Sequence, residues 1–526
     1  MVLRISCLVA ALALSVATVA TPLKPKGIEW SSCSELNNNM TTLVEASTTK
    51  PTIFECGKLS VPLDYTDPDS EFLQLQLFRV QATRKPILGT ILFNPGGPGG
   101  TAAEAMPIIA SDLKASVGEQ HHLVSWDPRG TGNTIPFICP EAAGQTDASS
   151  QSKRDIDALV STNLTEYFMS GGWESAGTIA DVCQASNNKT GSLIGTVSTT
   201  RDMLEIVDAI GEDGLLRFYG LSYGTVLGHY FATLFPERVE RMLLDGTVEP
   251  DAYRQGHYGD NIKDADSAVD GFFSACAENK EECLLAGYLK ANCTQDIYNA
   301  LNTIFEPAIS EGADDDAVAA LVLFRSRLFT GLYDPSIWPI ADSTLVDLLN
   351  ATSEKSDRAT EATPWSYGQA IGAEYGIRGA DATFKPDSAE AYLPKVHLQA
   401  NVSSFSDIWY LNSWPIAQWE MPANERIFQN FTAKTKHPIL YVNGKYDPVT
   451  PLSMAKAASK GFEGSVVLAH GGYGHTEMAH PSSCVQEHVQ AYFKEGKLPK
   501  HDTFCEPDLG IYELSKARDS KPRGAL

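Results

Sequence analysis

A serine between two glycines, placed where a strand turns directly into a helix, constrains this chain most. The segment Gly220 to Gly224 (GLSYG) follows a short apolar run, Leu215 to Tyr219, and precedes a predicted helix, Thr225 to Leu234. A sharp strand-to-helix turn lifts a serine hydroxyl away from the backbone, and glycine at the flanking positions avoids clashes in so tight a geometry. The pattern therefore predicts a nucleophile, Ser222, at the end of a buried strand.

Other short apolar runs have the character of parallel strands that are buried on both faces, since most are soon followed by Gly, Asp or Pro. They are Thr90 to Phe93, His122 to Trp126, Leu215 to Tyr219, Met242 to Leu244, Ile439 to Val442 and Ser465 to Ala469. Predicted helices such as Thr200 to Ile210 lie between several of them. This alternation predicts an α/β sheet with helices on both faces. The earlier run Phe72 to Val80 alternates in part and suits an antiparallel strand.

The stretch between Leu244 and Ile439 is far longer than an ordinary connection. Helices are predicted there over Asp264 to Cys276, Thr294 to Phe305 and Asp316 to Phe329. We expect a mainly helical lid inserted between late strands, over the carboxyl strand ends where the site of an open α/β sheet lies. The predicted organisation is a signal peptide (1–20), a first part of the core (21–248), the lid (249–430) and a second part of the core (431–526).

A nucleophilic serine needs a general base, and at strand–turn–helix sites of this kind the partners follow in the order Ser, acid, His. His475 combines that order with a glycine-rich loop after the last long predicted strand. We therefore expect His475 to be the base. His470 and His480 are the nearby alternatives.

The acid that orients the histidine is expected to be Asp447, which closely follows the predicted strand Ile439 to Val442. The rival is Asp245, directly after the predicted strand Met242 to Leu244. Asp447 is favoured because its position suits the strand that usually carries the acid. Asp245 is expected to cap a turn instead.

A second glycine-rich loop, Asn94 to Gly100 (NPGGPGG), directly follows the predicted strand Thr90 to Phe93. Such a loop lets backbone N–H groups approach a substrate oxygen closely. In this architecture one oxyanion donor is the residue after the nucleophile, here Tyr223, and the other comes from the early strand–helix loop. Phosphate binding is disfavoured, because the loop lacks a Lys-Ser/Thr ending and the G-x-G-x-x-G spacing.

Taken together, these motifs resemble the secreted tripeptidyl aminopeptidase-like branch of the α/β-hydrolases, from Trp30 to Cys505. The segments that carry the resemblance are Val61 to Tyr65 (VPLDY), Asn94 to Gly100 (NPGGPGG), Trp126 to Gly132 (WDPRGTG), Gly220 to Thr225 (GLSYGT) and Gly474 to Thr476 (GHT), with Cys484 soon after. The resemblance implies the α/β-hydrolase fold, with a mostly parallel central sheet flanked by helices. It also implies that Gly97 supplies the second oxyanion donor, and that Asp127 and Arg129 are structural.

The predicted function is a serine hydrolase that cleaves an amide or ester through an acyl-enzyme on Ser222. The resemblance implies an aminopeptidase releasing short N-terminal peptides or residues. Such an enzyme needs an acid for the substrate ammonium, and Glu361 and Glu374 of the lid are candidates. A carboxylesterase or lactonase acting on a small molecule is the main alternative, since it uses the same catalytic groups. Serine carboxypeptidases carry Glu where this chain has Leu221, and an inactive fold used for adhesion would lose the triad.

The first residues and the sequons predict a secreted glycoprotein. Arg4 precedes an apolar run, Ile5 to Val16, and small residues follow at Ala17 and Ala20, which is typical of a cleaved signal peptide. A membrane anchor would need about 20 apolar residues. Seven N-x-[ST] sequons predict glycosylation. Their asparagines are Asn39, Asn163, Asn188, Asn292, Asn350, Asn401 and Asn430.

The ten cysteines, of which Cys7 lies in the predicted signal peptide, are expected to be mostly paired in an oxidising compartment. Sequence proximity suggests the pairs Cys33–Cys56, Cys139–Cys183, Cys276–Cys283 and Cys484–Cys505, with Cys293 left over, although spacing does not decide connectivity. We expect no metal and no cofactor. The net charge of −24 argues against nucleic acid or an anionic membrane as partners, and leaves a small peptide or ester substrate.

Overall fold

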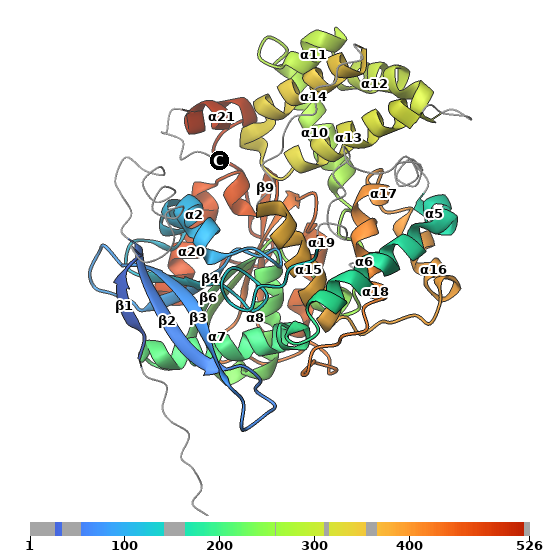
Figure 1. The fold of residues 1–526 in the computed structure, drawn as a ribbon. Helices are drawn as coiled ribbons and strands as arrows, with labels where there is room; N and C mark the ends of the chain where they lie inside the picture. The colour runs from blue at the N-terminus through green and yellow to red at the C-terminus, as the bar shows by residue number, and fades with distance from the viewer. Residues whose placement is uncertain are drawn as a thin grey trace, which may run out of the picture.

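The computed structural model describes residues 27–33, 54–140, 164–257, 259–309, 315–353 and 366–519. At its centre is a ten-stranded sheet in the order β1-β2-β3-β5-β4-β6-β7-β8-β9-β10 (Figure 1). β1, β2, β3 and β5 pair antiparallel, and every pair from β5 to β10 is parallel. The bounds are β1 Glu29–Ser32, β2 Phe54–Pro62, β3 Phe72–Val80, β4 Thr90–Asn94, β5 His122–Trp126, β6 Leu216–Leu221, β7 Val239–Asp245, β8 Leu440–Tyr446, β9 Val466–Tyr473 and β10 Phe504–Cys505.

Helices cover both faces of this sheet, which explains why its central strands are continuous apolar runs. Ile91 and Phe93 of β4 pack into one core with α2 (Ala102–Val117) and α20 (Ser483–Glu495). Leu92, between them, packs on the opposite face with α7 (Thr196–Ile210), α8 (Tyr223–Leu234) and α19 (Leu452–Ala458). Successive side chains of a strand point to opposite faces, so each strand contributes to both cores.

A large helical lid lies between β7 and β8 in the chain and has a separate hydrophobic core of its own. Its helices are α9 Pro250–Arg254, α10 Ala265–Glu278, α11 Leu284–Leu289, α12 Thr294–Ile309, α13 Asp315–Gly331, α14 Trp338–Ser353, α15 Ser366–Asp381, α16 Ala389–Gln399, α17 Ser406–Trp409 and α18 Ser413–Ala417. The predicted lid helices correspond to α10, α12 and α13 within a few residues. A mostly parallel sheet with a helical lid between late strands is the predicted fold class.

The sequence analysis did not predict one part of this lid, because that part lies outside residues 249–430. α5 (Leu164–Tyr167) and α6 (Trp173–Ser186) precede α7 in the chain, yet α5 packs against α16, and α6 packs against α15 and α18 (Figure 1). The contact is aromatic: the ring of Trp173 lies 5.2 Å from that of Tyr392, and the ring of Phe168, between α5 and α6, lies 5.1 Å from that of Trp414. The lid core is therefore built from two separate stretches of the chain.

Four disulfides join the cysteines in the pairs that sequence proximity suggests. Cys293 is unpaired and exposed, as expected. Within the described ranges, no helix combines the length and the apolar character that crossing a bilayer would require. The predicted signal peptide, Asn39, Asn163 and Glu361 fall outside the described residues.

Candidate active site

Ser222 occupies the sharp turn that the sequence predicts. β6 ends at Leu221, α8 begins at Tyr223, and Ser222 between them has φ 54° and ψ −120°, a conformation that a residue with a side chain rarely adopts. Two residues before and two residues after Ser222, only glycine fits. A Cβ at Gly220 would lie 2.4 Å from the carbonyl oxygen of Gly224, and a Cβ at Gly224 would lie 2.7 Å from that of Asn94. The turn therefore exists because these two positions have no side chain.

The residues predicted as base and acid meet at the carboxyl ends of β9 and β8. Nδ1 of His475 lies 2.9 Å from Oδ2 and 3.1 Å from Oδ1 of Asp447. Asp447 also accepts hydrogen bonds from the backbone N–H groups of Val449 (3.0 Å), Thr450 (2.8 Å) and Thr476 (3.2 Å). Burial alone would raise the pKa of Asp447, but the charge of His475 and these hydrogen bonds hold it below its ordinary value. The carboxyl is therefore an ionised, fixed acceptor.

Thr450 is a third member of this contact that was missed in the sequence analysis. Its hydroxyl donates to Oδ2 of Asp447 at 2.7 Å and lies 3.1 Å from Nδ1 of His475. A threonine three residues after the acid was visible in the sequence. Which way its side chain points is decided by the turn from Asp447 to Thr450, where two backbone N–H groups bind the same carboxylate oxygen.

The corner at Asp245 and Gly246 brings Ser222 and His475 together. The N–H of Ser222 donates to the carbonyl of Asp245 at 3.0 Å. A Cβ at Gly246 would lie 3.1 Å from Cε1 of His475, so the imidazole rests against this backbone. Among the described residues no hydrogen bond joins the Ser222 hydroxyl to His475; catalytic hydrogen bonds often tighten only when substrate binds.

The lid also contacts the histidine directly. The N–H of His475 donates to the carbonyl of Tyr333, between α13 and α14, at 2.8 Å. The two rings pack edge to face, with centroids 5.5 Å apart. A lid segment therefore holds the backbone of His475 and packs against its ring.

The rival assignments do not share this geometry. Among the described contacts, the carboxylate of Asp245 receives the N–H of Glu477 and has none with His475. His470 is buried, which lowers its pKa to about 4. His480 bonds to backbone only, through the N–H of Tyr473 and the carbonyl of Leu509.

The NPGGPGG loop is pressed against the serine turn, where the oxyanion donors are predicted. A Cβ at Gly96 would lie 2.9 Å from Cβ of Ser222 and 3.2 Å from the nitrogen of Tyr223. Gly97 has φ 107°, a conformation that glycine adopts readily. The side chain of Asn94 closes the loop by accepting the N–H of Gly96 at 3.0 Å. The predicted donors Gly97 and Tyr223 thus belong to two segments in direct backbone contact.

A buried network ties the lid to the oxyanion side of this site. Asp381, the last residue of α15, accepts the N–H of Thr196 at 2.8 Å, the Thr196 hydroxyl, and the hydroxyl of Tyr253 at 2.8 Å. The Thr196 hydroxyl lies 2.7 Å from that of Tyr223. Burial raises the pKa of Asp381 to about 6. A carboxyl from the lid therefore caps the start of α7 and supports the ring of Tyr223.

Asp127 and Arg129 have structural contacts. Asp127 accepts the N–H groups of Ala102 (2.9 Å) and Ala103 (3.4 Å) at the start of α2, which anchors the far end of the NPGGPGG loop. Arg129 forms a buried bidentate pair with Asp202, at 2.7 and 2.9 Å. Glu374, a candidate for binding a substrate amine, is paired with Arg378.

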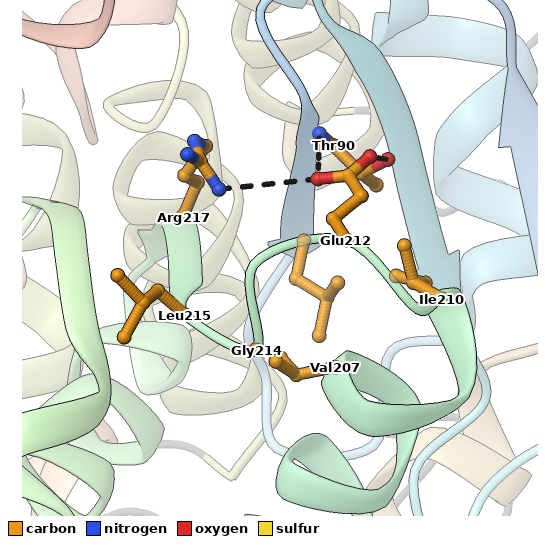
Figure 2. A pocket seen from close by; sticks show the side chains of 8 residues that line it. Thr90, Val207, Ile210, Glu212, Gly214, Leu215 and Arg217 are labelled. Carbon is orange, nitrogen blue, oxygen red and sulfur yellow. Dashed lines mark hydrogen bonds and ion pairs between the residues drawn. The ribbon is translucent and has the colours of Figure 1, made fainter.

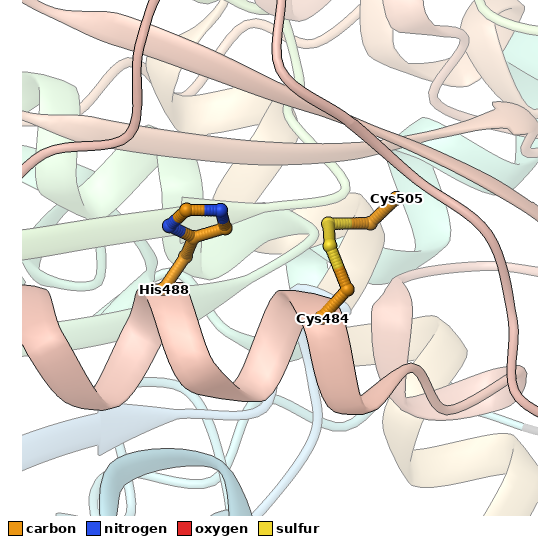
Figure 3. A group of neighbouring side chains, drawn as sticks. All are labelled: Cys484, His488 and Cys505. Atoms are coloured by element: carbon orange, nitrogen blue, oxygen red, sulfur yellow. A yellow bond between two sulfur atoms is a disulfide. The ribbon is translucent and has the colours of Figure 1, made fainter.

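Two other features could suggest a ligand site. Cys484, His488 and Cys505 cluster, but the two sulfurs are joined in a disulfide and offer no thiolate to a metal (Figure 3). A small pocket lined by Thr90, Glu212 and Arg217 lies at the amino ends of β4 and β6, the sheet edge opposite Ser222 (Figure 2). Glu212 accepts the N–H and the hydroxyl of Thr90 there, so this pocket is a structural tie.

The five sequon asparagines that the structure describes are all exposed, as glycosylation requires: Asn188, Asn292, Asn350, Asn401 and Asn430.

Comparison with known proteins agrees with the fold. Residues 89–282 match the family described as "alpha/beta hydrolase fold", and residues 401–505 match "TAP-like protein". The chain is a serine hydrolase of the α/β-hydrolase fold. Its similarity to the TAP-like family covers the second part of the core and the end of the lid, residues 401–505.

The relatives are named after two kinds of activity, peptide hydrolysis and ester hydrolysis. Serine protease Hip1 of Mycobacterium tuberculosis is 27% identical, covering 93% of each chain. Tripeptidyl aminopeptidase of Streptomyces lividans is 26% identical, covering 91% of this chain and 87% of its own. Carboxylesterase B of M. tuberculosis is also 26% identical, covering 93% of this chain and 92% of its own. Among solved structures, a hydrolase from Pseudomonas aeruginosa has TM-score 0.34 and 14% identity, covering 83% of this chain and 98% of its own.

Proposed function

We propose that this chain hydrolyses an amide or ester bond through an acyl-enzyme on Ser222, with His475 as general base and Asp447 as the acid that orients it. The observation that carries the proposal is the contact of His475 Nδ1 with a buried carboxylate, beside a serine held on a strained turn. Binding Nδ1 to Asp447 leaves Nε2 as the nitrogen that can take the serine proton.

In the first step, Nε2 of His475 takes the proton of Ser222 while the oxygen attacks the substrate carbonyl carbon. Asp447 stays ionised and stabilises the imidazolium, which its lowered pKa favours. The N–H groups of Gly97 and Tyr223 bind the oxyanion, and the amino end of α8 adds a favourable dipole. The imidazolium then protonates the leaving group, and water releases the acyl group by the same steps in reverse.

We propose an aminopeptidase that releases short N-terminal peptides or residues as the more specific activity. The match to a TAP-like family and the relative named tripeptidyl aminopeptidase support it. The relative named carboxylesterase B supports the second candidate, an esterase or lactonase acting on a small molecule. The two differ in one physical requirement, since only the aminopeptidase must bind the ammonium group of its substrate.

The deciding experiment compares peptides with a free and with an acetylated N-terminus, alongside simple esters. An aminopeptidase loses most of its kcat/KM when the amine is blocked, whereas equal rates on both peptides would rule this activity out. Ser222→Ala should abolish turnover and labelling by a fluorophosphonate. Ser186→Ala, an exposed serine of α6, is the matched control and should behave as the wild type.

We also propose that the protein is secreted and glycosylated. Four disulfides and five exposed sequons support this. Protein recovered from the medium of a eukaryotic host should begin after the predicted signal peptide and lose mass on endoglycosidase treatment. Retention in the cell with an intact N-terminus would contradict the proposal.

A further inference from the structure

Two buried carboxyl groups lie directly behind the catalytic loops. Asp245 ends β7 and Glu477 begins the short helix η8 (Glu477–Ala479), and both are at most 1% exposed. Among the described residues neither forms an ion pair with Lys, Arg or His. Two carboxylates without a cation in a buried site cannot both be ionised at low cost.

Hydrogen bonds connect the two groups. The N–H of Glu477 donates to both carboxylate oxygens of Asp245, at 3.1 Å each. The hydroxyl of Ser116 donates to Oε1 of Glu477 at 2.8 Å, and the hydroxyl of Tyr219 lies 3.4 Å from each carboxyl. Oε2 of Glu477 is buried and has no partner in the described residues. A charge on Glu477 would therefore be poorly compensated.

The same pair spans the two halves of the catalytic machinery. The backbone carbonyl of Asp245 holds the N–H of Ser222, while its side chain holds Glu477, two residues beyond His475. Thr476, which lies between His475 and Glu477 in the chain, has φ 71°, a strained conformation for a residue with a side chain. Such a conformation persists only when its surroundings hold it on both sides. Here Asp447 binds the N–H of Thr476 and Asp245 binds the N–H of Glu477.

We propose that Asp245 and Glu477 are positioning residues which share one proton and thereby hold the His475 loop against the Ser222 turn. The inference rests on the proposed function. With one proton the pair presents a single negative charge to the loop. When that proton is lost at higher pH, two like charges face each other, with Asp447 beside them, and the loop is pushed away from the serine.

The groups around the pair favour retention of the proton. Burial, and then the charge of Glu477, raise the pKa of Asp245 well above its ordinary value. Burial also raises the pKa of Glu477. Within the part of the chain that the structure describes, the other titratable groups that act on the pair are Tyr219 on β6, Asp447 after β8 and Asp112 on α2, and none of these three is a cation.

The test is the pH profile of kcat for Glu477→Gln, which keeps the shape of the side chain but cannot ionise. The wild type should lose kcat at alkaline pH, and the loss should be absent in Glu477→Gln, while the acid limb is unchanged. Glu477→Ala removes the contacts to Ser116 and Tyr219 and should lower kcat about 100-fold with little change in KM, the cost of a misplaced catalytic group. Glu487→Gln, exposed on α20, is the control and should match the wild type.

A pH profile of Glu477→Gln that coincides with the wild type would overturn the proposal. If poor folding of a variant prevents a reliable measurement of kcat, urea unfolding provides a second test of the proposal. Because folding raises the pKa of the pair, wild-type stability should fall as pH rises above the ordinary carboxyl range, and this fall should be smaller in Glu477→Gln. Ser222→Ala separates the two claims: an active Ser222→Ala enzyme defeats the proposed function, whereas an inactive one with unaltered Glu477→Gln behaviour defeats only the positioning pair.

Discussion

Replacing Asp381 by asparagine should reveal how strongly the lid is coupled to the catalytic core. Asp381 joins α15 to the start of α7 through two hydrogen bonds from Thr196 and to α9 through one from Tyr253, and it is buried. Folding raises its pKa from 3.8 to about 6, and the first cause is burial, which the hydrogen bonds from Thr196 and Tyr253 offset only in part. At 1.36 kcal/mol per pKa unit this corresponds to about 3 kcal/mol.

The direction of the pH dependence of stability follows from whether the folded or the unfolded protein binds the Asp381 proton more tightly. The folded protein holds the Asp381 proton better than the unfolded chain, so the contribution to stability is greatest below about pH 4 and is lost between about pH 4 and 6. The asparagine side chain of the variant cannot ionise. Asp381→Asn should therefore gain about 2.4 kcal/mol of unfolding free energy relative to the wild type between about pH 4 and 7.5.

Urea unfolding of both proteins at these two pH values measures this change. Any hydrogen bond that asparagine fails to make costs the same at each pH and cancels from the comparison. Asp387→Asn, an exposed residue shortly after α15, is the control and should parallel the wild type. If wild type and Asp381→Asn have the same pH dependence, the carboxyl is not desolvated as described and the reasoning fails.

Three substitutions test the catalytic geometry. Asp447→Asn should lower kcat about 10⁴-fold without unfolding the protein, because His475 would lose the partner that selects its tautomer; near-wild-type turnover would refute the role. Thr450→Val should lower kcat about tenfold or more, since a hydrogen bond to a charged group contributes about 1.5–3 kcal/mol, with KM unchanged. Gly224→Ala should lower both kcat and the unfolding midpoint, because its Cβ would meet the carbonyl of Asn94 at 2.7 Å; an unaffected enzyme would contradict the steric argument.

The sequence by itself determined the features that depend on local stereochemistry and on order along the chain. Strands buried on both faces must be apolar throughout, so β4 to β9 were predictable to within a few residues. The serine turn excludes side chains at Gly220 and Gly224, so a five-residue segment with glycine at both ends was enough to identify Ser222. The length between β7 and β8 alone required an inserted lid. Proximity along the chain also suggested the four disulfides.

Only the tertiary structure decided which distant side chains meet. Asp245 and Asp447 both follow parallel strands, and the sequence could rank them but not show that one carboxylate faces His475 and the other Glu477. The contact of Asp381 with Thr196 likewise joins segments far apart in the chain. Such contacts depend on how helices and loops pack in three dimensions, because the direction of a side chain is set by its neighbours in space. Local sequence records strand, turn and helix, but it does not record these neighbours.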